Sequence, residues 1–461
     1  MKPITHHSSL STFHFPLLAH SLFLLALAAY ILAGTPLVPF HGDEATILFA
    51  SRDYDYWIVQ GDISRILYNE TPLSPLEQDI RLRNGIVSKL LAGFAWHLAG
   101  YTLNDLNETW DWGGDYNYNM QNGHMPPEGL LHAARWSSSI LLATGVFVVF
   151  ALGWQLGGAP VAYLASLYYA LNPVLLLNGR RMMMEGSVTL FCLLVVLAGT
   201  WFLRTWTSSV GARHVLSLRW LSAITLGIVS GLALSSKQIT VFVLIGVFGA
   251  CLVYIVILSL RATSQRLRTL GYGIAGLVIA SVVTAVVFVA LNPVWWNDPI
   301  GRTIMALQDR QNLLNIQVSA FGSNNGDALG GFWRQVFIAL PQYYEVPAWQ
   351  DYIGGEITRY ESSLLQGISI GGSTFGGVLL LALFIIGIYA LLREKRIESA
   401  VRFVIGGWTL AVMLAALLLT PLEWQRYYLL VYPPLGLIAA LGFTYALQRL
   451  YQRFAPPTPK N

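Results

Sequence analysis

Long apolar runs separated by short polar connections dominate this sequence. A membrane-spanning helix needs about 20 predominantly apolar residues. Ten runs approach or exceed that length, so we expect an all-α integral membrane protein with about ten transmembrane helices. The runs lie near residues 15–33, 136–153, 160–178, 187–203, 220–236, 239–260, 271–294, 373–392, 402–420 and 428–447.

Basic residues between the runs predict the orientation, because cytoplasmic connections of membrane proteins are enriched in Lys and Arg. If the basic segments are cytoplasmic, the segments 34–135 and 295–372 form two large loops on the non-cytoplasmic face. The transmembrane domain then covers 1–447, and the tail is cytoplasmic. The basic segments are 204–219, 261–268, 393–396 and the tail 448–461.

The low content of charged residues indicates that lipid, and not water, surrounds much of this chain. The chain has 461 residues, of which 55% are hydrophobic and 11% charged, whereas soluble domains carry about 25% charged residues. The net charge of +4 is small and comes from residues at the ends of apolar runs. This pattern orients a membrane protein and does not indicate nucleic-acid binding. We expect a multi-pass protein of the inner or plasma membrane.

An acidic pair, Asp43 and Glu44, follows the first apolar run within about ten residues. Charge near the hydrocarbon edge is costly and usually has a function. One of the two could act as a general base. The alternative is a solvated acidic cap on the next helix, which the helix dipole favours.

A tight turn between two apolar runs carries Arg180, Arg181 and Glu185. The predicted orientation places it on the outer side, where arginines are unusual. The cations call for anionic partners, so either a phosphate binds here or an Arg–Glu pair pins a helical hairpin.

Two more cations lie at outer ends of apolar runs. Lys237 stands alone between two runs, and Arg426 precedes Tyr427 before the last run. Each could bind a phosphate or serve as an interfacial anchor. Together with the carboxylates they could move a sugar off a phosphate. The phosphate leaving group needs cations, and the acceptor hydroxyl needs a base.

The first outer loop contains a helical pattern over 79–98 and then an aromatic stretch, 110–119, rich in Gly and Asn. Aromatic faces stack on sugar rings and amides bond hydroxyls, so this stretch suits carbohydrate. An ordinary interfacial aromatic belt is the alternative.

These motifs, in this order, resemble the GT-C fold glycosyltransferases, above all the protein O-mannosyltransferase and lipid A aminoarabinose transferase families (glycosyltransferase family 39). The resemblance spans nearly the whole chain. Its motifs are Asp43-Glu44, Asn172-Pro173 with Gly179-Arg180 and Glu185, Gly231 with Lys237, Pro293 with Asp298-Pro299, and Arg426-Tyr427-Tyr428.

The resemblance implies a GT-C membrane domain whose partner is a polyprenyl-phosphate-linked sugar, and inversion at the anomeric carbon on the non-cytoplasmic face. It implies Asp43 as base, with Glu44 and Glu185 as further catalytic carboxylates. Donor phosphate binding would fall to four residues. These are Arg180, Lys237, Arg426 and Tyr427.

The long and distinctive segment 50–135 leaves the acceptor open among lipid, glycan and protein. A second departure from the family pattern is Glu185, where some relatives carry Asp. The resemblance gives no certain cofactor and leaves a divalent metal open. His41 beside two acids is, however, poor evidence for a metal site. A transporter or flippase for lipid-linked sugars is the alternative from another class. It should need polar residues at the bilayer midplane, where these runs are apolar. A polymerase of lipid-linked sugars is a third option.

Overall fold

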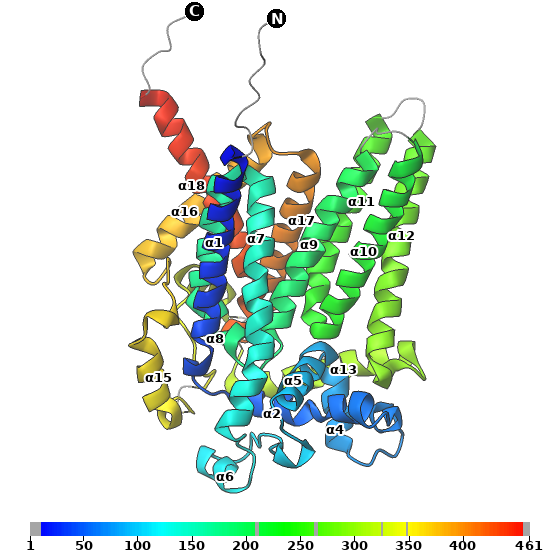
Figure 1. The fold of residues 1–461 in the computed structure, drawn as a ribbon, viewed down its shortest axis with the longest axis vertical. Coiled ribbons are helices and arrows are strands. Elements are labelled where there is room, and N and C mark those ends of the chain that lie inside the picture. Colours follow the sequence, from blue (N-terminus) through cyan, green and yellow to red (C-terminus); the bar gives the residue numbers. More distant parts are fainter. Residues whose placement is uncertain (1–10, 208–211, 262–265, 324–325, 347–348, 455–461) are drawn as a thin grey trace, which may run out of the picture.

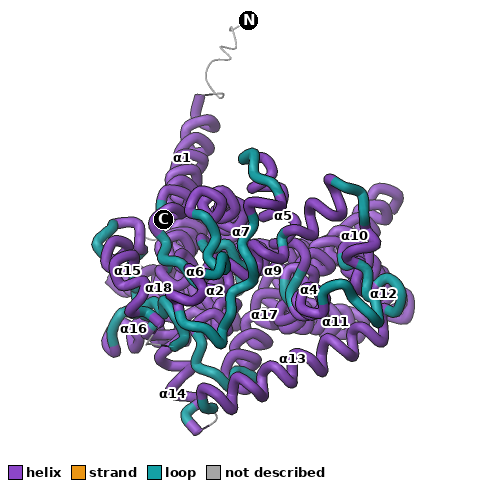
Figure 2. The backbone as a smooth tube through the Cα atoms, turned by 90° about the horizontal axis from the view of Figure 1, so that it is seen from below, coloured by secondary structure: helices purple, strands orange, loops and turns teal. Residues whose placement is uncertain are grey.

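A computed structural model describes residues 11–207, 212–261, 266–323, 326–346 and 349–454. This part of the chain is built of helices and connecting loops (Figures 1 and 2). The long helices are α1 (Ser11–Ala33), α7 (Glu128–Leu171), α9 (Glu185–Thr207), α10 (Ala212–Ser236), α11 (Val241–Arg261), α12 (Arg266–Leu291), α13 (Pro299–Phe321), α16 (Thr374–Arg393), α17 (Ser399–Leu418) and α18 (Tyr432–Phe454).

Short helices fill the connections. The α-helices are α2 (Gly42–Ala50), α3 (Arg52–Tyr54), α4 (Pro75–Arg83), α5 (Ile86–Leu98), α6 (Tyr116–Gln121), α8 (Pro173–Arg180), α14 (Ala328–Phe332) and α15 (Gly354–Glu361). The 3-10 and π turns are η1 (Thr35–Leu37), η2 (Asp55–Val59), η3 (Ile63–Ile66), η4 (Leu103–Asp105), η5 (Gln238–Thr240), η6 (Pro293–Trp295), η8 (Trp333–Ile338), η10 (Asp351–Ile353), η11 (Leu364–Gln366) and η12 (Gln425–Val431).

Among the described residues, nine helices are long and apolar enough to cross a membrane. This confirms an all-helical, multi-pass membrane protein. The sequence predicts about ten spans, and the difference lies in α7. Its helix is interrupted at Gly157 and Gly158, where Gly158 adopts φ +73° and ψ −162°. A residue with a Cβ is strained in that region of φ and ψ.

Beyond the two glycines, α7 folds back on itself. The Tyr169 hydroxyl donates a hydrogen bond of 2.9 Å to the Leu142 carbonyl oxygen, so residues 27 positions apart lie side by side. The run expected at 160–178 is therefore the second arm of α7. It breaks at Asn172, ahead of Pro173, and continues as α8.

The bundle has two different ends (Figure 1). At one end α1 begins and α18 ends, and the adjoining ends of α9 and α10, of α11 and α12, and of α16 and α17 lie there too. The short helices α2, α4, α5, α6 and α15 all lie at the opposite end, together with the long helix α13. The two long connecting segments therefore share one end of the molecule, and the basic connections lie at the other.

The first long segment contains two helices where the sequence predicts one helical stretch over 79–98. Helix α4 ends at Arg83 and α5 begins at Ile86, with Asn84 and Gly85 between them. A Cβ on Gly85 would lie 2.1 Å from the Ser236 carbonyl oxygen, so the break lets the chain pass closely over the end of α10. In the second segment, α13 runs across the end of the bundle, seen lengthwise in Figure 2.

Candidate functional site

The acidic pair lies in the first turn of α2, at the end of the bundle that carries the short helices. His41 is the N-cap residue of α2, and its side-chain Nδ1 accepts a hydrogen bond of 3.1 Å from the Asp43 amide. Glu44 accepts a bond of 3.1 Å from the His41 amide. This reciprocal arrangement is a capping box, with His41 in the position that Ser or Thr usually takes. It fixes the directions of both carboxylates.

Asp43 forms an ion pair with Arg426 from η12, 383 positions away in the sequence. The Asp43 side chain is 29% exposed and that of Arg426 is 13% exposed. Two of the residues that the sequence predicts as site residues are thus brought into contact. Asp43 is open enough for a ligand to reach it.

Glu44, in contrast, is completely buried and fully paired. Arg135 binds it with two parallel hydrogen bonds, 2.8 Å to Oε1 and 2.7 Å to Oε2. The Met182 amide donates a further bond of 2.7 Å to Oε1. Burial opposes ionisation of Glu44, but the charge and hydrogen bonds of Arg135 outweigh it and lower the pKa of the Glu44 carboxyl. Glu44 therefore holds α2 against α7 and the turn before α9.

Glu345 completes the surroundings of Asp43. Its Oε2 lies 2.9 Å from His41 Nε2, and its Oε1 lies 3.1 Å from Arg426 Nε. Arg426 therefore stands between two carboxylates, Asp43 and Glu345. Burial opposes ionisation of Glu345, but His41 beside it lowers the pKa of the carboxyl. Burial also lowers the pKa of His41, although Glu345 acts in the other direction.

A second ion pair joins two more of the predicted residues. Lys237, after α10, lies 2.8 Å from Glu185 Oε1 at the start of α9. The other oxygen of Glu185, Oε2, is buried without a hydrogen-bond partner in the described part of the chain. Lys237 retains two N–H donors beyond this bond. Within the described residues, no hydrogen bond or ion pair joins Lys237 or Glu185 to Asp43.

The two arginines of the turn before α9 mainly brace the fold. Arg180 is fully buried and donates four hydrogen bonds, three of them to backbone carbonyls. Arg181 donates to the Pro39 and Tyr343 carbonyl oxygens, at 3.0 and 2.8 Å. Arg180 therefore ties the end of α1 to the second long segment, and Arg181 ties the start of the first long segment to the second. A phosphate ligand at Arg180 would have to displace bonds that the fold uses.

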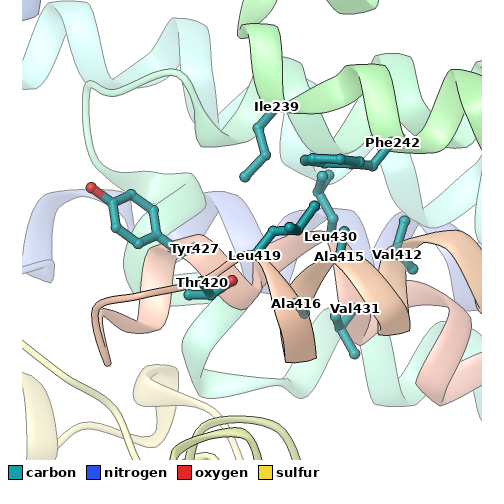
Figure 3. A pocket seen from close by; sticks show the side chains of 10 residues that line it. All are labelled: Ile239, Phe242, Val412, Ala415, Ala416, Leu419, Thr420, Tyr427, Leu430 and Val431. Carbon is teal, nitrogen blue, oxygen red and sulfur yellow. The ribbon is translucent and has the colours of Figure 1, made fainter. Parts of the chain in front are cut away.

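Tyr427 lies at one end of an apolar groove between α17, η12 and the start of α11 (Figure 3). Its hydroxyl points away from the aliphatic side chains and lies 3.5 Å from Gln317 Oε1 on α13. The groove thus begins beside Arg426 and leads along the hydrophobic helices. Its other lining residues are Ile239, Phe242, Val412, Ala415, Ala416, Leu419, Thr420, Leu430 and Val431.

Sequence reasoning missed Arg135, Tyr344 and Glu345. Arg135 could have been noticed as a charge at the start of an apolar run on the outer side. Glu345 and Tyr344, whose hydroxyl accepts a 2.9 Å bond from the Gly42 amide, give no sequence signal beyond their aromatic neighbourhood. Asp298, part of one motif, caps α13 by accepting a 2.9 Å bond from the Gly301 amide. Across the described ranges, no three His, Cys, Asp or Glu side chains are grouped to hold a metal ion.

Residues 86–296, slightly under half of the chain, match the family model described as dolichyl-phosphate-mannose-protein mannosyltransferase. ArnT from Cupriavidus metallidurans, solved with undecaprenyl phosphate, has a similar structure, with a TM-score of 0.53 and 13% sequence identity. The archaeal oligosaccharyltransferase AglB from Archaeoglobus fulgidus, solved with an inhibitory peptide and a dolichol-phosphate, has a TM-score of 0.53 and 12% identity.

The chain has the GT-C fold. The two alignments cover 94% and 97% of it, so the likeness extends over both long segments and the bundle. The chain spans only 61% of ArnT and 53% of AglB. No curated protein sequence matches it significantly. The family match and the two structures support the resemblance to polyprenyl-phosphate-dependent glycosyltransferases that the sequence motifs indicate.

Proposed function

We propose that this GT-C protein is a glycosyltransferase that moves a sugar from a polyprenyl-phosphate donor to an acceptor hydroxyl. The transfer takes place on the non-cytoplasmic side and inverts the configuration of the anomeric carbon. Asp43 is the base, Arg426 and Lys237 bind the donor phosphate, and Glu185 orients Lys237. Tyr427 lies where the lipid enters, and Glu44 and Arg180 hold the site in place.

The observation that carries this proposal is the pair formed by Asp43 and Arg426. A partly exposed carboxylate and a guanidinium are the two groups that the reaction needs. In the absence of substrate they neutralise each other. A donor phosphate is a stronger, bidentate partner for a guanidinium than one carboxylate oxygen. It would draw Arg426 away and leave Asp43 unpaired beside the acceptor.

The proposed transfer is a direct displacement at the anomeric carbon. Asp43 takes the proton of the acceptor hydroxyl, and the acceptor oxygen attacks the anomeric carbon from the face opposite the phosphate. The bond from the anomeric carbon to the phosphate oxygen breaks, and the polyprenyl phosphate leaves with the electron pair. Arg426 and Lys237 stabilise the charge that develops on this oxygen.

The apolar groove beside Tyr427 supports a lipid-linked donor over a nucleotide sugar. Its walls are mostly apolar, and it begins next to the cation that would hold the phosphate. An isoprenoid chain has the matching chemistry, whereas a nucleotide would need polar partners for its base and ribose.

The experiment uses the purified full chain in proteoliposomes with crude membrane acceptors. Three labelled donors are compared: a sugar on polyprenyl phosphate, the same sugar on polyprenyl diphosphate, and the nucleotide sugar. We expect transfer from the polyprenyl phosphate alone. Transfer from the nucleotide sugar, or none from any donor across a panel of sugars, would contradict the proposal.

Charge-neutral variants test the phosphate site. Arg426→Gln and Lys237→Gln should each raise the donor KM at least tenfold, because a charge-assisted hydrogen bond contributes about 1.5–3 kcal/mol. Arg334→Gln is a matched control, since Arg334 forms an exposed pair with Glu423 at the same end of the molecule. An unchanged donor KM in both site variants would exclude these residues as phosphate ligands.

A further inference from the structure

The two long segments meet in a cleft lined almost entirely by aromatic side chains. The first segment contributes Trp110, Trp112 and Tyr116, and the second contributes Tyr344, Trp349 and Tyr352; Gly114 is the seventh lining residue. The rings hold one another in place. Tyr116 stacks on Tyr352 with centroids 5.3 Å apart and planes 6° apart, and Trp112 lies 5.1 Å from Trp349.

We propose that this aromatic cleft binds the acceptor and that the acceptor is a neutral carbohydrate. The inference rests on the proposed transferase function and names the substrate class of the same site. A pyranose ring has an apolar C–H face and a rim of hydroxyls. A flat indole or phenol ring offers the complementary face and, at its edge, a polar group.

The polar edges of the cleft are available to a ligand. Within the described residues no hydrogen bond is made by the indole N–H groups of Trp112 and Trp349 or by the hydroxyls of Tyr116 and Tyr352. Trp112 and Tyr352 are also 42% and 46% exposed, so the cleft is accessible from water.

A carboxylate next to the cleft adds a hydroxyl acceptor. Glu356 Oε2 accepts a 2.8 Å bond from the Phe40 amide, and its negative charge acts on Tyr116. Its other oxygen can accept from a sugar hydroxyl. Among the described residues, no Lys or Arg lines the cleft, so an anionic acceptor would find no cationic partner there. The groove of Figure 3 is lined mainly by aliphatic side chains, which suit a lipid, whereas this cleft is lined by aromatic rings, which suit a sugar.

The position of the cleft links it to the base. Gly42, the residue before Asp43, donates its amide to the Tyr344 hydroxyl at 2.9 Å. A Cβ on Gly42 would lie 2.8 Å from the Trp110 ring. Two walls of the cleft therefore rest on the backbone that presents Asp43. His41 also stacks on Tyr344, with ring centroids 4.5 Å apart. A sugar in the cleft would have a hydroxyl beside the Asp43 carboxylate.

The test is ligand-observed NMR on the full chain in nanodiscs, prepared without sugar-based detergent. The probes are the methyl glycosides of glucose, galactose and mannose. We expect saturation transfer to the ring C–H protons of at least one glycoside in the parent. Trp112→Ala and Trp349→Ala, from opposite walls, should each weaken this binding at least tenfold. Trp296→Ala is the matched control, because Trp296 is 41% exposed and lies outside the cleft.

The outcomes separate this inference from the transferase proposal, because binding of polyprenyl phosphate is measured on the same samples. Polyprenyl phosphate binding without glycoside binding would overturn the cleft proposal alone. Glycoside binding without polyprenyl phosphate binding would uphold the cleft and overturn the lipid donor. Equal glycoside binding in the parent and both cleft variants would overturn the cleft. Binding of a Ser/Thr peptide in place of any glycoside would also overturn it.

Discussion

Asp43 and Glu44 are adjacent in the sequence, yet they have different surroundings. Successive residues of a helix point about 100° apart, so Asp43 faces Arg426 and water while Glu44 faces the buried Arg135. The sequence predicts that only one of the two can serve the site. It could not identify the partners, because Arg135 and Glu345 lie 91 and 304 positions from the residues that they bind.

The buried Glu44–Arg135 pair predicts a stability effect. Glu44→Gln leaves the Arg135 charge buried without its partner, a change that costs about 3–5 kcal/mol. We expect a large fall in the thermal midpoint of the full chain in detergent. Glu398→Gln is the control, since it breaks an exposed pair with Arg204 that contributes about 1 kcal/mol or less. Equal midpoints for the two variants would mean that Glu44 does not brace the fold.

His41 predicts a pH dependence of stability. Burial, helped by Arg181 and Arg426 and opposed by Glu345, lowers the pKa of His41 below its ordinary value, which is about 6.5. The unfolded chain therefore takes up a proton at a pH where the folded chain does not. The free energy of unfolding should rise with pH up to about 6.5 and then level off.

The variant His41→Asn checks this assignment, because Asn also caps helices but does not titrate. Its stability should rise less steeply than that of the parent between about pH 5 and 6.5. The measurement is the thermal midpoint at each pH. The same slope in both proteins would assign the pH dependence to other groups.

At the scale of elements, the length of the apolar runs predicts the helices well. It does not predict how the turns between them direct the chain. The spans over 187–203, 239–260 and 373–392 appear as α9, α11 and α16 with modest shifts of their ends. The runs at 136–153 and 160–178 appear as the two arms of α7. Hydropathy does not show that two apolar runs fold back on each other within a turn of a few residues.

Gly158 lies in that turn, and its backbone conformation predicts that replacing it lowers stability. With φ +73° and ψ −162° it occupies a region that costs other residues about 1–3 kcal/mol. No atom of the described residues lies within 4 Å of a Cβ placed there, so Gly158→Ala should lower stability through the backbone alone. Gly249→Ala, inside α11 and equally uncrowded, should be neutral or stabilising. Equal unfolding midpoints for both variants in detergent would contradict this account of the turn.

At the scale of the whole molecule, the two long segments lie at one end, where we propose the active site. Asp43, Lys237, Glu345 and Arg426 each lie at least 81 positions apart in the sequence. The fold brings Asp43, Glu345 and Arg426 into one network. The basic connections at the opposite end predict that this end faces away from the cytoplasm. The order of the motifs in the sequence indicated the GT-C fold. The aromatic cleft could not be predicted from the sequence, because it forms only where the two long segments meet in the structure.

Cysteine labelling tests the orientation. Leu73→Cys and Leu364→Cys place exposed thiols on the two long segments, and Lys395→Cys places one on a basic connection. The native Cys192 and Cys251 are buried. In intact cells a membrane-impermeant reagent should label the first two sites and spare the third. Labelling of position 395, or of only one outer site, would contradict the proposed topology.

The rate of sugar transfer by Asp43→Asn, measured together with donor binding, tests the central claim most directly. Loss of a general base typically costs 10²- to 10⁴-fold in rate. We expect kcat to fall by about that factor, while polyprenyl-phosphate-sugar binding is kept or tightened because Arg426 is released. Measured per folded molecule, kcat should fall less in Glu44→Gln than in Asp43→Asn. Asp62→Asn, on the same segment, should keep the parent rate. If Asp43→Asn transfers sugar as fast as the parent, Asp43 is an acidic cap and not the base.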